Sequence, residues 1–555
     1  MKPTVIFFIG FTMFLQNVLG QNQLWERDLP GVGTFASPRT WDLNQDGIKD
    51  VLIGDGSELD SIGHLYAFDG ATGGTLWSIE RNGELYTSPQ FSRVNQDIYE
   101  DVIMGGRVFN LFCVDGLDGT LLWEFDTSQA SPEGQGWLQF YEPKTVNDVT
   151  SDGIRDIVVV NGGDVLAQPG ETNRKPGYLM LLDGADGTIL NMAVMPDTAE
   201  SYSSVVVVEG NSPSETKIFF GSGGETLKGS LWMATLDQLL FNDISNAEEL
   251  ISGINKGFIA PPVLVDLNSD NVLDIIAAGF DGTMTMVNGA SLEVEWTYAN
   301  TLFEVYGTPG VGDFDGNGQL DVIVSFVRGT WPAYDYSVQV MFQGDNGNVM
   351  RMDTIGLQHS SVLVYDVDND GKDEGILSFA DYALFQTGQA ILNYDSGVEV
   401  LFVNPTSTNI ASTSCLDDLD NDGDLELMEV RSTNPIAGYI LKVWNTPYLV
   451  VDPLKWTAYH GTNYNGIYEP VNPVSITGLQ NRFGQPRIEY LNNGIELVFE
   501  DVTSVLYFID CTGRPVPAPV KMNEYSYKVE NLSSGIYILQ YENEYRKSSI
   551  KLVVP

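Results

Sequence analysis

A short acidic loop recurs along this chain, and its spacing constrains the fold more than any other feature. The clearest copy runs from Asp42 to Asp50 (DLNQDGIKD) and is followed by the apolar stretch VLIG. Similar loops start at residues 148, 266, 313, 366 and 418, and a degraded copy starts at Arg93. Their spacing of about 50 residues, with one interval about twice as long, is typical of propellers and other repeat arrays.

The long interval between residues 148 and 266 predicts one hidden unit. We place it in the stretch YSSVVVVEGNSPSETKIFFGSG, where Glu209 stands at the first loop position. The array then contains eight units.

Each unit also carries a second pattern after the acidic loop. Residues 67–77 (AFDGATGGTLW) have weaker copies that end at Trp123, Asn191 and Trp296. The pattern indicates a strand, a glycine-rich tight turn and another strand. One unit is therefore four strands, and four-stranded sheets repeated radially form a β-propeller. We predict an all-β chain with an eight-bladed propeller.

The two ends of the array predict how the ring closes. Residues 24–27 (LWER) precede the first unit much as residues 76–80 (LWSIE) precede the second. The last unit has its acidic loop and the stretch LKVWN, but irregular sequence follows. We expect the strand near residues 23–28 to complete the eighth blade; an open solenoid is the alternative.

The acidic loops have the composition of cation sites. Positions 1, 3, 5 and 9 offer side-chain oxygens, position 7 offers a carbonyl, and glycine at position 6 permits the backbone reversal. Six to eight oxygen ligands suit Ca²⁺ better than Mg²⁺, which prefers an octahedral shell with several waters. Position 9 opens a strand, so an EF-hand is excluded. The expected ligands are Asp42, Asn44, Asp46, Ile48, Asp50, Asp148, Thr150, Asp152, Ile154, Asp156, Asp266, Asn268, Asp270, Val272, Asp274, Asp313, Asp315, Asn317, Gln319, Asp321, Asp366, Asp368, Asp370, Lys372, Glu374, Asp418, Asp420, Asp422, Asp424 and Glu426.

Two units lack the full ligand set, and we predict no calcium there. In the second unit Arg93 replaces the first carboxylate, and we expect its guanidinium to pair with Asp97 or Asp101. The hidden unit has Pro213 and Lys217 at the fifth and ninth positions. For the other loops, solvated acidic turns without an ion are the alternative.

The remaining sequence predicts a domain order. Residues 1–20 have one early lysine and a short apolar run, typical of a cleavable export signal; an uncleaved anchor is the alternative. We assign 21–450 to the propeller. Residues 451–475, rich in Tyr, Pro and Asn, are expected to form a linker. Residues 476–555 alternate apolar strands with Gly, Asn and Ser turns, which indicates a small β-sandwich.

Composition excludes several functional classes. Asp and Glu number 75 against 28 Lys and Arg, a net charge of −47, which disfavours nucleic acids and anionic membranes as partners. Cys113, Cys415 and Cys511 are far apart and form no CxxC pair, so a disulfide framework is not expected. The sequence contains no HExxH, GxSxG or Walker-type motif.

The loops resemble the FG-GAP and VCBS repeats found in integrin α-chains and many secreted bacterial proteins. The element at 67–77 resembles the tryptophan-docking motif of pyrroloquinoline-quinone propellers. The tail resembles the carboxy-terminal sorting domain of type IX secretion, through the turn at 511–514, the strand GIYIL from Gly535 and the terminal KSSIKLVV. That resemblance implies contact with the secretion machinery and export to the cell surface or beyond.

Two classes of function remain open. The first is a secreted or cell-surface calcium-binding module for recognition, adhesion or scaffolding, with an unknown protein or glycan ligand. In it, Trp137, Phe140 and Tyr141 could face a sugar or peptide, or pack in the core. The second is an enzyme on the same propeller, either a polysaccharide lyase or a quinoprotein-like dehydrogenase. The adjacent-cysteine pair of many quinoproteins is missing. No catalytic or cofactor-binding residue other than the calcium ligands is predicted.

Overall fold

A computed structural model describes the chain from residue 23 to residue 468, apart from short loops, and the strand backbones of the carboxy-terminal part. The loops outside the described residues are 30–33, 57–61, 96, 130–138, 164–169, 332, 382–383, 385, 406–411, 433–437 and 451–453. The proposed signal at 1–20 and Cys511 also lie outside them. The chain divides into two compact units, Met1–Val474 and Ser475–Pro555.

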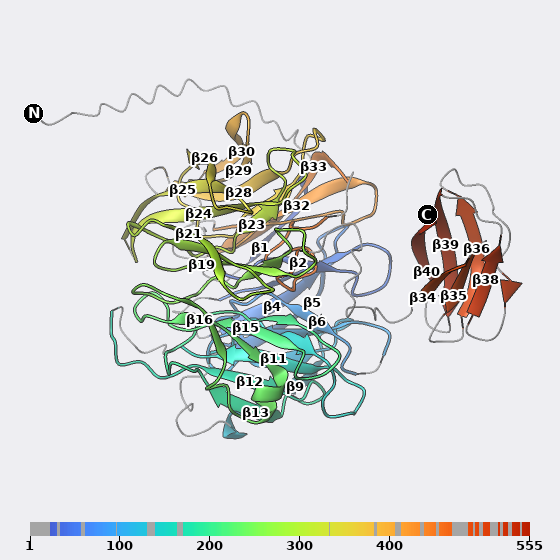
Figure 1. The fold of residues 1–555 in the computed structure, drawn as a ribbon, viewed down its shortest axis with the longest axis horizontal. Helices are drawn as coiled ribbons and strands as arrows, with labels where there is room; N and C mark the ends of the chain where they lie inside the picture. Colours follow the sequence, from blue (N-terminus) through green and yellow to red (C-terminus); the bar gives the residue numbers. More distant parts are fainter. Residues whose placement is uncertain are drawn as a thin grey trace, which may run out of the picture. The chain divides into compact units, whose positions relative to one another are not determined.

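The first unit is an eight-bladed propeller of antiparallel sheets, which confirms the predicted fold (Figure 1). The first four blades are β2 (Arg39–Trp41), β3 (Asp50–Gly54), β4 (Ile62–Phe68) and β5 (Thr75–Asn82); β6 (Gln90–Ser92), β7 (Asp101–Gly105), β8 (Leu111–Val114) and β9 (Leu121–Glu124); β10 (Lys144–Val146), β11 (Asp156–Asn161), β12 (Tyr178–Leu182) and β13 (Ile189–Val194); and β14 (Val206–Val208), β15 (Lys217–Gly221), β16 (Ser230–Thr235) and β17 (Glu248–Ser252). The last of these is the hidden unit.

The second half of the ring repeats the plan. Its blades are β18 (Val263–Val265), β19 (Asp274–Gly279), β20 (Thr283–Val287) and β21 (Val294–Ala299); β22 (Phe303–Glu304) and β23 (Gly310–Gly312) beside β24 (Asp321–Thr330), β25 (Ala333–Gln343) and β26 (Val349–Thr354); β27 (Leu363–Tyr365), β28 (Glu374–Asp381), β29 (Gln386–Asn393) and β30 (Gly397–Pro405); and β31 (Cys415–Asp417), β32 (Asp424–Ser432), β33 (Tyr439–Leu449) and β1 (Gln23–Leu29). A 3-10 turn, Thr127–Gln129, and a short helix, α1 (Leu236–Leu240), lie between strands.

The amino-terminal strand closes the ring, as predicted. β1 pairs antiparallel with β33, from Trp25 opposite Val443 to Leu29 opposite Tyr439. The blue strands of the first blade therefore lie beside the orange strands of the last (Figure 1). The eighth blade takes one strand from the start of the propeller sequence and three from residues 415–449, which joins two distant parts of the sequence.

Tryptophans at the outer strands join neighbouring blades. The indole N–H of Trp25 donates to the carbonyl of Gly70 in the next blade at 2.7 Å, and the same bond joins Trp77 to Gly116. Trp25 also lies flat on the turn, because a Cβ on Gly73 would come within 2.5 Å of its ring. The sequence motif is thus a contact between blades, and the closing strand carries one as well.

The ring has two faces with different loops. Since strands alternate in direction, the connections between first and second strands, which include the acidic loops, all reach one face, here called the acidic-loop face. The connections between second and third strands, and those that lead to the next blade, reach the opposite face.

Residues 454–468 lie inside the ring, although composition predicts a linker there; they are called the hub segment below. Its backbone carbonyls accept hydrogen bonds from first strands of different blades, as in Val364 N to Trp456 O and Leu416 N to Thr457 O, both 2.8 Å. Tyr468 N in turn donates to Leu264 O at 2.8 Å. These strands therefore face a common centre, and the hub segment fills it.

Burial explains why this segment does not behave as a linker. Trp456, His460 and Tyr468 are at most 2% exposed. Trp456 and Tyr468 belong to the apolar core of the fifth to seventh blades, whereas Tyr464 packs with the first and eighth. The aromatic residues that suggested an irregular connection supply the packing for the ring's interior.

The second unit consists of two antiparallel sheets. One contains β34 (Arg487–Leu491), β35 (Gly494–Val498), β38 (Ser526–Glu530) and β37 (Val520–Lys521), and the other β36 (Thr503–Asp510), β39 (Gly535–Asn543) and β40 (Lys547–Val554). This is the strand content expected of a small β-sandwich. Among the described residues of the chain, no helix has the length and apolar character needed to cross a membrane.

Replacing Trp25 tests the closure. Trp25→Ala removes a 5%-exposed side chain and its bond to Gly70, and we expect a loss of about 3–5 kcal/mol in the free energy of unfolding. Leu24→Ala, at a 43%-exposed neighbour on the same strand, is the control and should cost less than about 0.5 kcal/mol. Urea unfolding of both variants measures the difference. Equal stability of the two variants would mean that β1 does not hold the ring.

Candidate metal centres

The six complete acidic loops share one backbone path, set by their own side chains. The first-position carboxylate accepts the N–H of position 6, as in Gly47 N to Asp42 Oδ2 at 3.0 Å. The fifth-position side chain accepts the N–H of position 7, as in Lys372 N to Asp370 Oδ1 at 2.9 Å. The same bonds recur at Asp148, Asp266 and Asp313. Each loop is therefore a tight coil whose oxygens turn inward.

The coil needs two residues in the left-handed region. At position 6, Gly47 has φ +92° and Gly371 has φ +87°, which confirms the reversal expected at this glycine. A Cβ on either glycine would meet nothing within 4 Å, so backbone conformation and not space selects glycine. Position 4 is also left-handed, as in Asn369 with φ 60°, a requirement that the sequence analysis missed. Its Asn, Ser, Gln and Gly residues were the available signal.

In three blades the predicted ligands converge as carboxylates. Carboxylate oxygens of positions 1, 3 and 9 lie within 4.8 Å of one another, and each group could hold a metal ion. The groups are Asp313, Asp315 and Asp321; Asp366, Asp368 and Glu374; and Asp418, Asp420 and Glu426. In the other three loops position 3 is Asn44, Thr150 or Asn268, so two carboxylates face a neutral oxygen there.

The ninth-position carboxylate is the buried member of every loop. Asp50, Asp321, Glu374 and Glu426 are at most 2% exposed. Burial, with the neighbouring carboxylates, raises the pKa of Asp50 and Asp321 to about 7 and that of Glu374 and Glu426 to about 8. Backbone N–H groups oppose this shift without cancelling it. The loop therefore disfavours its own fully ionised state when no cation is bound.

Two buried oxygens of the complete loops fit a cation, although Asp101 Oδ1, in a unit predicted to bind none, is also buried without a hydrogen-bond partner in the described part of the chain. Asp321 Oδ2 and Asp418 Oδ1 are buried and have no hydrogen-bond partner among the described residues. An unpaired buried carboxylate oxygen is costly, and a hard cation would satisfy it. All the converging groups are oxygens, which favours a hard ion such as calcium or magnesium over zinc.

The same carboxylate connects the loop to the next blade. Asp50 Oδ1 accepts the N–H of Gly70 at 3.3 Å, and the carbonyl of Gly70 accepts the indole of Trp25 from the eighth blade. The series recurs from Asp156 through Gly184 to Trp123, and from Asp321 through Gly344 to Trp296. A cation in the loop would thus hold the group on which the contact between blades rests.

The two units that lack the full ligand set have ion pairs at their first loop position. The ion pair predicted for Arg93 is wrong. Arg93 Nε lies 3.0 Å from Glu100 and does not pair with Asp97 or Asp101. Asp101 accepts the N–H groups of Val94 and Asn95 at 2.7 and 3.0 Å, both through Oδ2. In the hidden unit, Glu209 forms an ion pair with Arg155 of the third blade.

A buried charged cluster, which the sequence analysis missed, lies against the hub segment. Glu142 Oε1 accepts from Arg39 and Gln90, each at 2.8 Å, forms an ion pair with Lys144, and lies 3.2 Å from Nδ1 of His460. Burial opposes ionisation of Glu142, but the positive charges hold its pKa well below the usual range. Arg39, Glu142 and His460 are 1% exposed, so this cluster joins blades and has no access to solvent.

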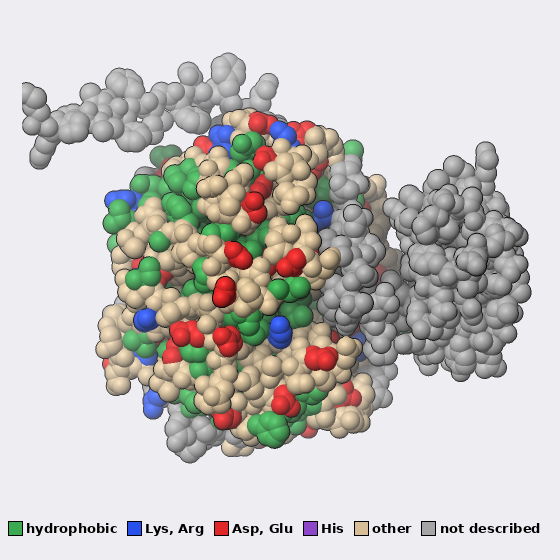
Figure 2. Space-filling view, in the orientation of Figure 1, with side chains coloured by type: hydrophobic (Ala, Val, Ile, Leu, Met, Phe, Trp, Pro, Cys, Tyr) green, Lys and Arg blue, Asp and Glu red, His purple; other side chains and the backbone are tan. Residues whose placement is uncertain are grey.

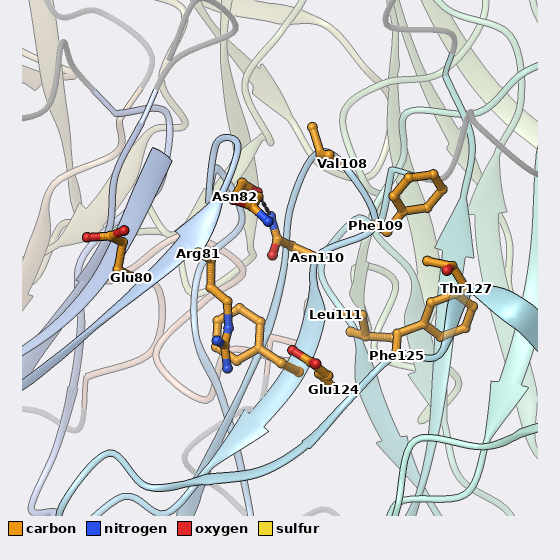
Figure 3. Close-up of a pocket in the computed structure, with 11 residues that line it drawn as sticks. Glu80, Arg81, Asn82, Val108, Phe109, Asn110, Leu111, Glu124, Phe125 and Thr127 are labelled. Carbon is orange, nitrogen blue, oxygen red and sulfur yellow. Dashed lines mark hydrogen bonds between the residues drawn. The ribbon is translucent and has the colours of Figure 1, made fainter. Parts of the chain in front are cut away.

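A cavity of about 320 Å³ lies between the outer strands of the first two blades (Figure 3). The Arg81 guanidinium lies 4.9 Å from the centre of the Phe112 ring, and Glu124 also lines the cavity. Val108 and Phe109 line it as well, and both have a left-handed backbone, with φ 54° and 67°. This lining combines exposed carboxylates with a cation and apolar groups. It contains none of the predicted metal ligands.

Comparisons with known proteins support the propeller fold but identify neither a family nor a function. No family model and no curated protein matches the sequence. Among solved structures, the quinohemoprotein alcohol dehydrogenase of Pseudomonas putida is 12% identical, with a TM-score of 0.51 over 85% of this chain and 80% of that one. Sqt1 of Saccharomyces cerevisiae is 11% identical, with a TM-score of 0.51 over 77% and 99%. A europium-containing methanol dehydrogenase is 10% identical, with a TM-score of 0.50 over 76% and 93%.

A glycine substitution tests the loop conformation. Gly371→Ala places a Cβ at φ +87° and should cost about 1 kcal/mol or more in the free energy of unfolding. Gly371→Asn should cost less, because Asn271 occupies the same position of the fifth blade with φ 68°. Calcium-free urea unfolding of both variants separates backbone strain from metal binding. A more stable alanine than asparagine variant would contradict the assigned backbone path.

The raised pKa values predict how stability depends on pH. A carboxyl whose pKa rises from about 4 in the unfolded chain to 7–8 in the fold favours the protonated folded state. Without metal, the melting temperature should therefore fall as pH rises from 5 to 8. Calcium binds the ionised form, so its stabilising shift should grow over the same window. Thermal melts at four pH values, with EDTA or CaCl₂, measure both; a calcium shift that is constant with pH would contradict this.

Proposed function

We propose that this protein is an exported, calcium-stabilised propeller that serves as a recognition, adhesion or scaffold module at the cell surface. The observation that carries the proposal is the position of the acidic side chains in the blades. The converging carboxylates lie in loops whose ninth residue supports the contacts between blades. A cation bound by these carboxylates would therefore stabilise the ring itself. The two faces of the rigid ring would be available to bind a partner.

Calcium is the ion that the donor set favours. Each loop offers side-chain oxygens from four positions and one carbonyl, and Ca²⁺ accepts six to eight such ligands in flexible geometry. Weak sites of this kind fill outside the cytosol, where calcium is plentiful, and the bound ion then adds its binding energy to the stability of the fold.

The interior of the ring gives no support for an enzyme that works in a central channel. The hub segment fills that centre, and its aromatic residues and His460 are buried there. The buried carboxylate Glu142 is already paired with cations. The likeness to alcohol dehydrogenases is a likeness of fold at 10–12% identity.

Export is the part of the proposal that rests on the two ends of the chain. The signal-like residues 1–20 would direct the chain out of the cytosol, and the second unit would act as the sorting domain. The surface suits a soluble, exported protein, since acidic side chains are spread over the visible face with few basic ones (Figure 2). A strongly acidic surface attracts calcium and repels anionic polymers.

Metal removal tests the proposal on the full mature chain. EDTA should lower the melting temperature by many degrees, because bound ions stabilise only the folded ring. Calcium should restore the melting temperature at lower concentration than magnesium, because the loops offer the oxygen ligands that Ca²⁺ prefers. The double variant Asp366→Asn with Asp368→Asn should reduce the number of bound calcium ions. Asp97→Asn, in the unit predicted to bind no calcium, is the matched control and should leave it unchanged. An unchanged melting curve in EDTA would refute the proposal.

A further inference from the structure

Four tyrosines occupy one repeated position on the face opposite the metal loops. Tyr86, Tyr141, Tyr202 and Tyr306 each lie in the connection to a new blade, three or four residues before its first strand. Tyr86 and Tyr141 rings are 5.5 Å apart, and Tyr141 and Tyr202 are 6.1 Å apart. We call this set the tyrosine collar.

A buried acidic residue precedes three of these tyrosines by two positions. Glu84, Glu200 and Glu304 are at most 3% exposed. Each forms an ion pair with a base from another connection on the same face, and the bases are Arg107, Arg174 and Lys256. Gln139 takes this position before Tyr141 and accepts a hydrogen bond from Arg107 at 2.6 Å. The motif Glu/Gln-x-Tyr is therefore a second repeat, unrelated to the metal loops.

These buried groups hold the tyrosine rings in place. Tyr202 donates its hydroxyl to Glu200 at 2.7 Å. Tyr306 and Tyr334 share a hydrogen bond of 2.7 Å between their hydroxyls, and Tyr334 also donates to Glu304. Tyr86, Tyr202 and Tyr306 remain half-buried, so fixed rings lie at the surface. Rigid aromatic rings lose little entropy when they contact a ligand.

An exposed tryptophan extends the collar at one side. Trp331 is 44% exposed at the end of the β24–β25 hairpin, and its ring lies 6.3 Å from that of Tyr306 and 6.2 Å from that of Tyr334. The His359 ring stacks on that of Tyr306 at 4.6 Å, and its buried Nε2 has no partner among the described residues. Of the aromatic residues singled out from the sequence, Phe140 is fully buried and Trp137 lies outside the described residues.

Ring closure does not require the collar. Other units place Phe35 or Ile259 at the same position, four residues before the first strand, and form equally complete blades. Buried ion pairs contribute little net stability compared with apolar packing, because desolvation offsets their attraction. Three such pairs lie beneath the surface tyrosines and contribute little to the stability of the ring. We therefore infer that they position the tyrosines for a role of that surface.

We propose that the collar, with Trp331, binds the sugar chain of an uncharged polysaccharide. A sugar ring offers an apolar C–H face to an aromatic ring and hydroxyl groups to tyrosine hydroxyls. The net charge of −47 on the whole chain disfavours acidic polymers as ligands. This inference rests on the proposed recognition function and names the ligand class that the module takes.

Affinity electrophoresis of the full mature chain in calcium tests the proposal. The probes are laminarin, mannan and dextran as uncharged polymers, polygalacturonate and alginate as acidic ones, and a pool of extended peptides. We expect binding to at least one uncharged polymer. Trp331→Ala and Tyr306→Ala should each weaken it about tenfold or more, because each removes a stacking surface. Tyr306→Phe keeps the ring and should retain most of the affinity.

Trp41→Ala is the matched control, since Trp41 is 39% exposed and lies next to the metal loop of the first blade. It should leave binding unchanged. The collar proposal is overturned if no uncharged polymer binds, if only peptides or acidic polymers bind, or if Trp41→Ala weakens binding as much as Trp331→Ala. The calcium-dependent melting shift is measured on the same samples. Its presence without polysaccharide binding would refute the collar and leave the proposed calcium-stabilised module standing.

Discussion

The structure depends on a buried carboxylate at the end of the acidic loop, which seven of the eight blades carry. This group has backbone N–H donors from its own loop and from the neighbouring turn, and the turn's carbonyl holds a tryptophan from the adjacent blade. A buried carboxylate is costly unless it is paired. The loop, the turn and the blade contact are therefore coupled, and the charge state of one side chain affects all three.

The propeller could be predicted from the sequence because each unit repeats the same short motifs. The acidic loop and the glycine turn before Trp77 recur with a constant period, and their hydrogen bonds lie within one blade or between neighbours. Closure by the strand around Trp25 was predictable for the same reason, since a second copy of the pattern ends at Trp77. Local repeats reveal contacts that are themselves repeated.

The hub segment and the collar were not predictable in this way. Trp456 and Tyr468 contact strands that lie far from them in sequence, and nothing in their own neighbourhood indicates burial. The partner predicted for Arg93 was wrong, since Arg93 pairs with Glu100 while Asp101 Oδ2 and Asp97 Oδ1 accept backbone N–H groups. The Glu-x-Tyr repeat was visible in the sequence, but its meaning depends on Arg107, Arg174 and Lys256, which come from other loops.

The hub segment has a mechanical consequence. Its hydrogen bonds reach first strands on several sides of the ring, and the chain continues from Tyr468 toward the second unit. Tension applied through that unit would enter at the axis and be shared among several blades. A chain leaving from an outer strand would instead peel one blade at a time. A propeller built in this way would resist unfolding under tension without any additional cross-link.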